Sequence, residues 1–189
     1  MSENLSKAEL MEQLKSVALQ MQEHREKFPT ASSDLNPAQP AITFESALEA
    51  ANPVAEIGAR IRGPYESMTE SERVFWKARC FMGDTFNGGF IQTFENSTGD
   101  YFADVEMFVN EYCSEPVRQI FRELKHMFPR GDVPADHDQR EKVIKKIKES
   151  KGNDPFDALD GRFYALEKEF DEGLITFAKK HRESFRGLK

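Results

Sequence analysis

Apolar side chains recur three or four positions apart through most of this chain, and no stretch alternates apolar and polar residues over the length of a strand. Spacing of this kind places the apolar side chains of a segment on one face of an α-helix, whereas a half-buried strand needs a period of two. The pattern therefore predicts an all-α fold. The longest apolar run, Phe163 to Leu166, has four residues, and a membrane-spanning helix needs about 20, so we expect no membrane partner.

A proline-rich segment divides the chain into two parts. Ser6 and Glu9 have the spacing of a capping box at the start of an expected helix that runs to about Lys27. Residues 29–41 hold three prolines and few apolar side chains, which is typical of an extended linker. We therefore expect an N-terminal helix and linker over residues 1–41, and one irregular multi-helix domain over residues 42–189.

Phenylalanine recurs every seven residues near the C-terminus, at Phe156, Phe163, Phe170 and Phe177. A seven-residue apolar repeat keeps one face of a helix apolar along its whole length. We interpret this segment as a core helix, interrupted near Gly173, because glycine weakens a helix interior. The same repeat could instead form a seam that joins two chains, which would make the protein a homodimer.

The residue types that carry catalysis or bind metals do not cluster. The four histidines are scattered, and Cys80 and Cys113 lack the spacing of a zinc or redox pair. Residues 136–138 form a compact Asp-His-Asp group, which we interpret as part of a solvated loop. We therefore expect no enzyme activity, no cofactor and no metal. Two cysteines without a disulfide pattern favour a reducing, cytoplasmic location.

Charge is unevenly distributed along the chain. The sequence has 33 acidic and 26 basic residues, a net charge of −7, and no Lys or Arg lies between Cys80 and Val117. The bases concentrate later, in residues 140–151 and 179–189. If one helix covered residues 100–115, four acids would fall within about 60° on the helical wheel, and a second strip would lie in the last segment. We expect these acids to form a partner-facing surface: Asp100, Asp104, Glu111, Glu115, Asp160, Glu167 and Asp171.

The segment Asn87–Gly99 carries a recognisable motif. We expect its Asn-Gly-Gly start to interrupt a helix that opens at Thr69 and Glu72, with Asn87 as a cap and the glycines allowing a tight turn. The motif resembles the signature of the DNA-mimic protein family, and residues 156–164 resemble a second element of that family. We expect its residues to be structural: Asn87, Gly88, Gly89, Phe90, Gln92, Asn96 and Gly99.

The resemblance implies an all-helical, non-enzymatic binding protein. Members of this family are expected to occupy a basic, DNA-binding protein through carboxylates arranged like DNA phosphates, without binding nucleic acid themselves. The alternative is a small helical adaptor or immunity-type protein, whose partner surface is not DNA-like. A continuous acidic surface would favour mimicry, whereas a surface with interspersed bases would favour the adaptor.

Overall fold

The computed structural model describes residues 42–61, 64–152 and 154–188, all of which belong to one compact unit. In these residues the secondary structure is helical throughout, without strands, which confirms the predicted all-α class. The expected N-terminal helix and the proline-rich linker lie outside the described residues.

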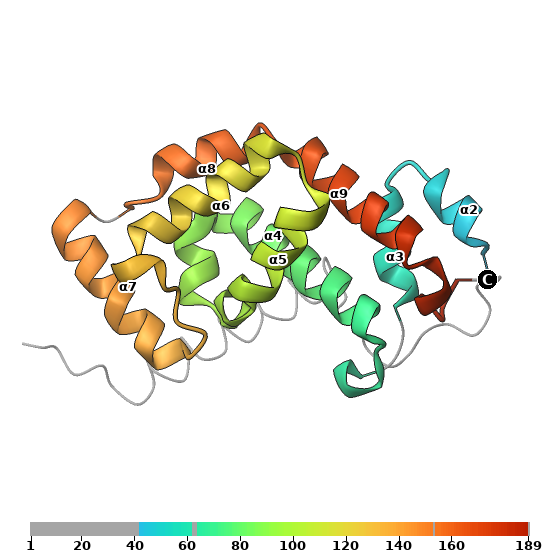
Figure 1. The fold of residues 1–189 in the computed structure, drawn as a ribbon, viewed down its shortest axis with the longest axis horizontal. Coiled ribbons are helices and arrows are strands. Elements are labelled where there is room, and N and C mark those ends of the chain that lie inside the picture. Colours follow the sequence, from blue (N-terminus) through green and yellow to red (C-terminus); the bar gives the residue numbers. More distant parts are fainter. Residues whose placement is uncertain (1–41, 62–63, 153, 189) are drawn as a thin grey trace, which may run out of the picture. The chain divides into compact units, whose positions relative to one another are not determined.

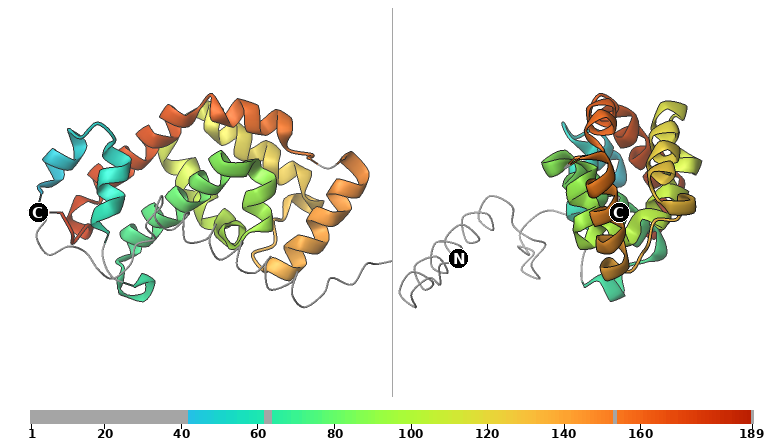
Figure 2. Two further views of the ribbon diagram at one scale, coloured as in Figure 1. Left: turned by 180° about the vertical axis from the view of Figure 1, so that it is seen from behind. Right: turned by 90° about the vertical axis from the view of Figure 1, so that its left-hand side faces the viewer.

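Eight α-helices make up the described domain, joined by short loops and four 3₁₀ turns. Helices α2 and α3 lie at one end of the domain and α7 at the other, with α4, α5 and α6 between them (Figure 1), and the view from behind shows the same order (Figure 2). Their bounds are α2 Phe44–Leu48, α3 Pro53–Arg60, α4 Glu70–Glu95, α5 Phe102–Tyr112, α6 Glu115–Met127, α7 His137–Lys151, α8 Asp157–Tyr164 and α9 Glu167–Lys180.

Helix α4 begins at the predicted capping box. The Thr69 hydroxyl accepts the amide of Glu72 at 3.1 Å, and the Glu72 carboxylate accepts the amide of Thr69 at 2.8 Å. The Glu72 carboxylate is also buried and accepts the backbone amide of Arg186 at 3.1 Å. The same side chain therefore caps α4 and fixes the C-terminal segment against its start.

The core is largely aromatic. Phe81 and Phe94 each contact several other rings at centroid distances of 4.9–6.3 Å. Edge-to-face and offset pairs at these distances add to the free energy of area burial. The four phenylalanines of the seven-residue repeat are all buried, which confirms that this segment belongs to the core and leaves its rings unavailable as a seam between two chains.

The interruption of the last segment lies elsewhere than predicted. Helix α8 ends at Tyr164 and α9 begins at Glu167, so the break precedes Gly173. Gly173 lies inside α9 and is buried, and a Cβ there would come within 2.6 Å of the Cys113 sulfur. This glycine therefore permits close approach between α9 and the end of α5.

Candidate partner-binding surface

The motif glycines bend α4 as predicted. The backbone leaves the helical region at Gly88 (φ −160°, ψ 26°) and Gly89 (φ 75°, ψ 177°). Of the two, only Gly89 has a φ in the left-handed region, which residues with a side chain rarely adopt. The sequence Asn87-Gly88-Gly89 thus divides α4 into two parts with different directions.

A carboxylate from α8 caps the second part of α4. The backbone amide of Phe90 donates to Asp160 Oδ1 at 2.8 Å, and a Cβ on Gly89 would overlap Asp160 Oδ2. Asn87 is exposed, and among the described residues its side chain makes no hydrogen bond, so the expectation that it acts as the cap is wrong. The first motif and the second, 70 residues later, therefore meet at one buried hydrogen bond.

Asp160 does not belong to an exposed acidic strip. Its side chain is only 5% exposed, because it points at the bend in α4. Burial raises the pKa of its carboxyl to about 6; the Phe90 amide opposes this shift, while the nearby Asp154 and Asp157 add to it. The expectation of Asp160 as a partner-facing residue is therefore corrected to a structural role.

Tyr164, the last residue of the second motif, also contacts the bend. Its hydroxyl donates to the carbonyl of Thr85 at 3.0 Å, and its ring lies 5.3 Å from that of Phe86. The Thr85 carbonyl lies about one helical turn before the bend at Gly88 and Gly89. The phenol thus satisfies a carbonyl group close to the bend.

The remaining motif residues also have structural contacts. The Asn96 side chain donates to Asp84 at 3.1 Å, and Gln92 lies against Gly88. A Cβ on Gly99 would come within 2.5 Å of Arg140 Nε. The structural role that we expected of the motif stays a prediction, and its cap at Asn87 is not formed.

Arg140, the first base of the basic segment 140–151, is buried. Its side chain is fully buried, and it donates to the carbonyls of Phe94 at 2.8 Å and Asn96 at 2.9 Å. It also donates to the carbonyls of Pro134 and Ala135. Arg140 therefore joins α7 to the connection between α4 and α5.

The four acids expected on one helix lie on three different elements. The backbone is extended at Cys113 (φ −95°, ψ 164°), directly after α5, so one helix does not persist over residues 100–115. The acids are distributed as follows: Asp100 in the 3₁₀ helix Ser97–Tyr101, Asp104 and Glu111 in α5, and Glu115 at the start of α6. The predicted continuous row is therefore wrong.

Each of these four acids forms an ion pair with a base of the same domain. Three of these bases are distant in sequence from the acids that they pair with, so helical spacing alone could not predict the pairing. The pairs are Asp100–Arg140 at 2.6 Å, Asp104–Lys77 at 2.5 Å, Glu111–Lys180 at 2.7 Å and Glu115–Arg122. The stretch between Cys80 and Val117 contains no Lys or Arg, but bases from other parts of the chain lie beside its acids in the folded domain.

The basic segments supply other counter-ions as well. Lys148 pairs with Glu95 at 2.5 Å, and Arg182 pairs with Glu45 at 2.9 Å. Bases and acids are consequently interspersed over α2, α4, α5, α7 and α9. These helices therefore do not present a continuous row of unpaired carboxylates.

Unpaired acids remain on α8 and α9. Glu167 and Asp171 are four residues apart in α9, and neither forms an ion pair with a described residue. Burial raises the pKa of the Asp171 carboxyl; Glu167 raises it further, and the charge of Arg79 opposes the shift. Asp154 and Asp157, which the sequence did not single out, are exposed and likewise without an ion pair to a described residue.

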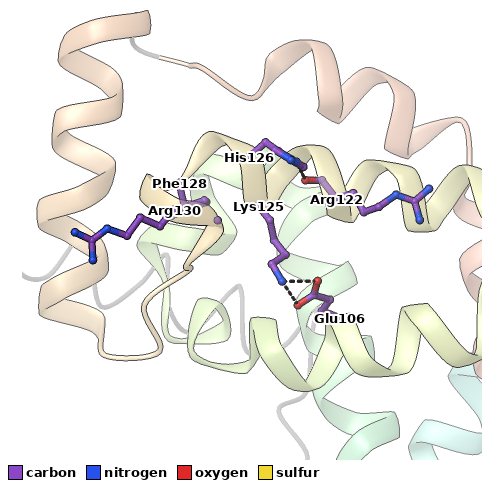
Figure 3. Close-up of a pocket in the computed structure, with 7 residues that line it drawn as sticks. Glu106, Arg122, Lys125, His126, Phe128 and Arg130 are labelled. Atoms are coloured by element: carbon purple, nitrogen blue, oxygen red, sulfur yellow. Dashed lines mark hydrogen bonds and ion pairs between the residues drawn. The ribbon is translucent and has the colours of Figure 1, made fainter.

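A shallow hollow lies between α5 and the end of α6 (Figure 3), and its volume is about 500 Å³. Its lining is mostly basic, but Lys125 is neutralised by Glu106 at 3.0 Å. His126 Nδ1 is bonded to the carbonyl of Arg122, and the guanidinium groups of Arg122 and Arg130 point away to either side. The hollow therefore lacks converging donors for an anion.

The described residues hold no group of three or more His, Cys, Asp or Glu side chains placed to bind a metal ion. The two thiols are poorly ionised, since burial raises the pKa of Cys80 to about 11 and that of Cys113 to about 12. In the described part of the chain, no helix is both long and apolar enough to cross a membrane.

This geometry defines a class of protein. It is an irregular all-α domain in which one helix bends at a glycine pair and a buried carboxylate caps the helix after the bend. The chain belongs to the DMP19-like protein family, whose model matches residues 66–181. Both motifs lie inside the matched range, which confirms the resemblance seen in the sequence. Comparisons with curated proteins and with solved structures gave no match.

Proposed function

We propose that this chain is a non-enzymatic, cytoplasmic protein-binding domain of the adaptor type, which recognises a partner protein without a DNA-like array of carboxylates. The observation that supports this function is the pairing of Asp100, Asp104, Glu111 and Glu115 with bases of the same domain.

The physical reason lies in how paired charges act at a distance. Duplex DNA carries one phosphate charge per ~1.7 Å of its axis, without fixed cations between the phosphates. A carboxylate with an ammonium group 2.5–2.7 Å away presents a dipole to an approaching protein. Its field falls off faster than that of a single charge, and salt screens it further over about 8–10 Å. Paired acids therefore attract a DNA-binding protein only weakly.

DNA mimicry is the second candidate function, and one observation favours it. The exposed acids Asp157 of α8 and Glu167 of α9, with Asp154 just before α8, form no ion pair with a described residue. A mimic built on them would bind a basic, DNA-binding protein through α8 and α9 and not through the acids of residues 100–115.

Two variants separate these functions. A partner is first captured from a lysate of the native cell on the immobilised full chain, and its affinity is then measured as salt is raised. With Asp100→Asn, Asp104→Asn and Glu111→Gln combined, the adaptor function predicts unchanged affinity and a shallow dependence on salt. The matched variant carries Asp157→Asn and Glu167→Gln; a large loss of affinity in it, together with a steep salt dependence, would favour mimicry and contradict the adaptor.

A further inference from the structure

One short helix, α8, holds the bend of α4 through two side chains. The Asp160 carboxylate accepts the amide of Phe90 at 2.8 Å. One turn later in α8, the Tyr164 hydroxyl donates to the carbonyl of Thr85 at 3.0 Å. The non-helical residues of α4 lie between these two attachment points. We call Asp160 and Tyr164, with these two hydrogen bonds, the bend clamp.

The negative charge of Asp160 has little compensation at this place. The side chain is buried, and it forms no ion pair with a described residue. The charged groups that act on it, Asp154 and Asp157, are both acidic. A buried carboxylate with acidic neighbours favours its neutral, protonated form. The surroundings of Asp160 therefore oppose its ionisation.

The helices that pack against α8 add no described base to Asp160. Helix α4 presents the backbone amide of Phe90 to it. On α6 the nearby acid is Glu123, whose two carboxylate oxygens accept from Arg162 of α8 at 2.6 and 3.0 Å. Tyr164 stays neutral, since burial raises the pKa of its phenol. Asp160 is therefore the group of the bend clamp that titrates below neutral pH.

Solvent lies close to the bend clamp. Tyr164 is 38% exposed, and Gly161, the residue after Asp160, is also exposed. A Cβ on Gly161 would meet no atom within 4 Å, so this side of α8 is open. A small displacement of α8 from the bend would therefore bring the Asp160 carboxylate into contact with water.

We propose that the bend clamp is a pH-sensitive switch, which is closed while Asp160 is protonated and opens locally when Asp160 is ionised. In the open state water hydrates the carboxylate, and the amide of Phe90 loses its acceptor. The amide favours the ionised carboxylate, but burial outweighs it, and the two neighbouring acids add to the effect of burial. This inference goes beyond the proposed function, because it concerns the domain itself, whichever partner it binds.

The direction of the switch follows from proton binding. In the closed clamp the carboxyl of Asp160 has a pKa of about 6, whereas a hydrated aspartate has about 3.9. Closure is therefore favoured most below about pH 4, and this advantage is lost as pH rises to about 6. The equilibrium constant for opening should rise by about a hundredfold over that window.

Hydrogen exchange of the Phe90 amide, measured by NMR on the full chain, tests the proposal. After correction for the intrinsic exchange rate, its protection should fall by about a hundredfold from about pH 4 to about pH 7. It should also stay below the protection of the slowest core amides, because the opening is local. In the Asp160→Asn variant this dependence on pH should disappear.

Two results of this experiment would overturn the proposal. Protection of Phe90 that equals that of the slowest core amides would mean that the contact opens only when the whole domain unfolds. Protection of Phe90 that does not change with pH would mean that the ionisation of Asp160 does not control the contact.

A second pair of variants leaves Asp160 in place. The Phe90 amide proton shift should titrate with Asp160, since the two groups share a hydrogen bond. Replacing the exposed Asp157 by asparagine removes a repelling charge, so the midpoint of this titration should fall. Glu172→Gln, at an exposed position of α9, removes an equal charge and should leave the midpoint unchanged. An unchanged midpoint in Asp157→Asn, or equal shifts in both variants, would contradict the proposal.

Discussion

At the residue scale, the bend of α4 depends on one glycine and one carboxylate. Gly89 adopts a left-handed φ of 75°, and its lack of a side chain leaves room for Asp160, which bonds the amide of Phe90. The conformation and the space are separate requirements, and glycine meets both. This pair therefore holds the two motifs of the chain together.

Replacing Gly89 by alanine should destabilise the domain by about 1–3 kcal/mol, because the new Cβ is strained at this φ and overlaps Asp160. The matched variant is Gly88→Ala. Its φ of −160° suits any residue, and the overlapping atoms belong to the flexible Gln92 side chain. Urea denaturation should show a clearly larger loss for Gly89→Ala, and equal losses would contradict this account of the bend.

The raised pKa of Asp160 predicts a pH dependence of stability. Its carboxyl has a pKa of about 6 in the folded chain and about 3.9 when unfolded. Between these values the folded state binds more protons than the unfolded state, so this group's contribution to stability falls as pH rises from about 4 to about 6. As pH rises through that window, the unfolding free energy of the wild type should fall relative to that of the Asp160→Asn variant. A difference that is constant with pH would show that the pKa is not raised.

The sequence could predict the bend but not its cap. Two adjacent glycines indicate a turn from local conformational preference alone. The capping carboxylate comes from a residue 70 positions away, and Asn87, the local candidate, points to solvent. The sequence also placed Asp160 in an acidic strip on a helix surface, and nothing in that local pattern predicted that the residue is buried.

At the element scale, Arg140 is the main polar link between α7 and the rest of the domain. Its guanidinium satisfies four backbone carbonyls and the carboxylate of Asp100. The carbonyls belong to the end of α4, the connection after it and the loop before α7. The concentration of bases in residues 140–151 gave no sign that the first of them is buried.

Replacing Arg140 by methionine should cost about 3 kcal/mol or more, since several buried carbonyls lose their donors together. Lys142→Met, at an exposed position of the same helix, removes an equal charge and should change the unfolding free energy little. Chemical denaturation of both variants checks the prediction. Similar small effects would mean that Arg140 is not required to hold α7 in place.

At the scale of the whole molecule, sequence patterns predicted the fold class and the family but not the surface. Helical periodicity is local, so it identified helices and the buried phenylalanines. Ion pairs such as Glu111–Lys180 join residues 69 positions apart, and helical periodicity does not show which distant helices pack together. The base-free stretch therefore indicated an acidic surface that the folded chain largely neutralises.

Neutralising the paired acids should lower thermal stability. Combining Asp100→Asn, Asp104→Asn and Glu111→Gln removes three ion pairs, and one of them leaves the buried Arg140 without its carboxylate. The melting temperature of this variant should fall. Glu141→Gln is the control, because Glu141 is exposed and makes no ion pair with a described residue. A melting temperature that rises in the triple variant would indicate that repulsion among the acids outweighs their pairing.

Competition against duplex DNA for the captured partner tests the proposed function most directly. The partner is bound to the full chain, and DNA is titrated in at physiological salt. If the chain is an adaptor that does not present a DNA-like surface, DNA should leave the complex intact, and the affinity should depend only weakly on ionic strength. Stoichiometric displacement by DNA, with a steep loss of affinity as salt rises, would contradict the account and establish mimicry.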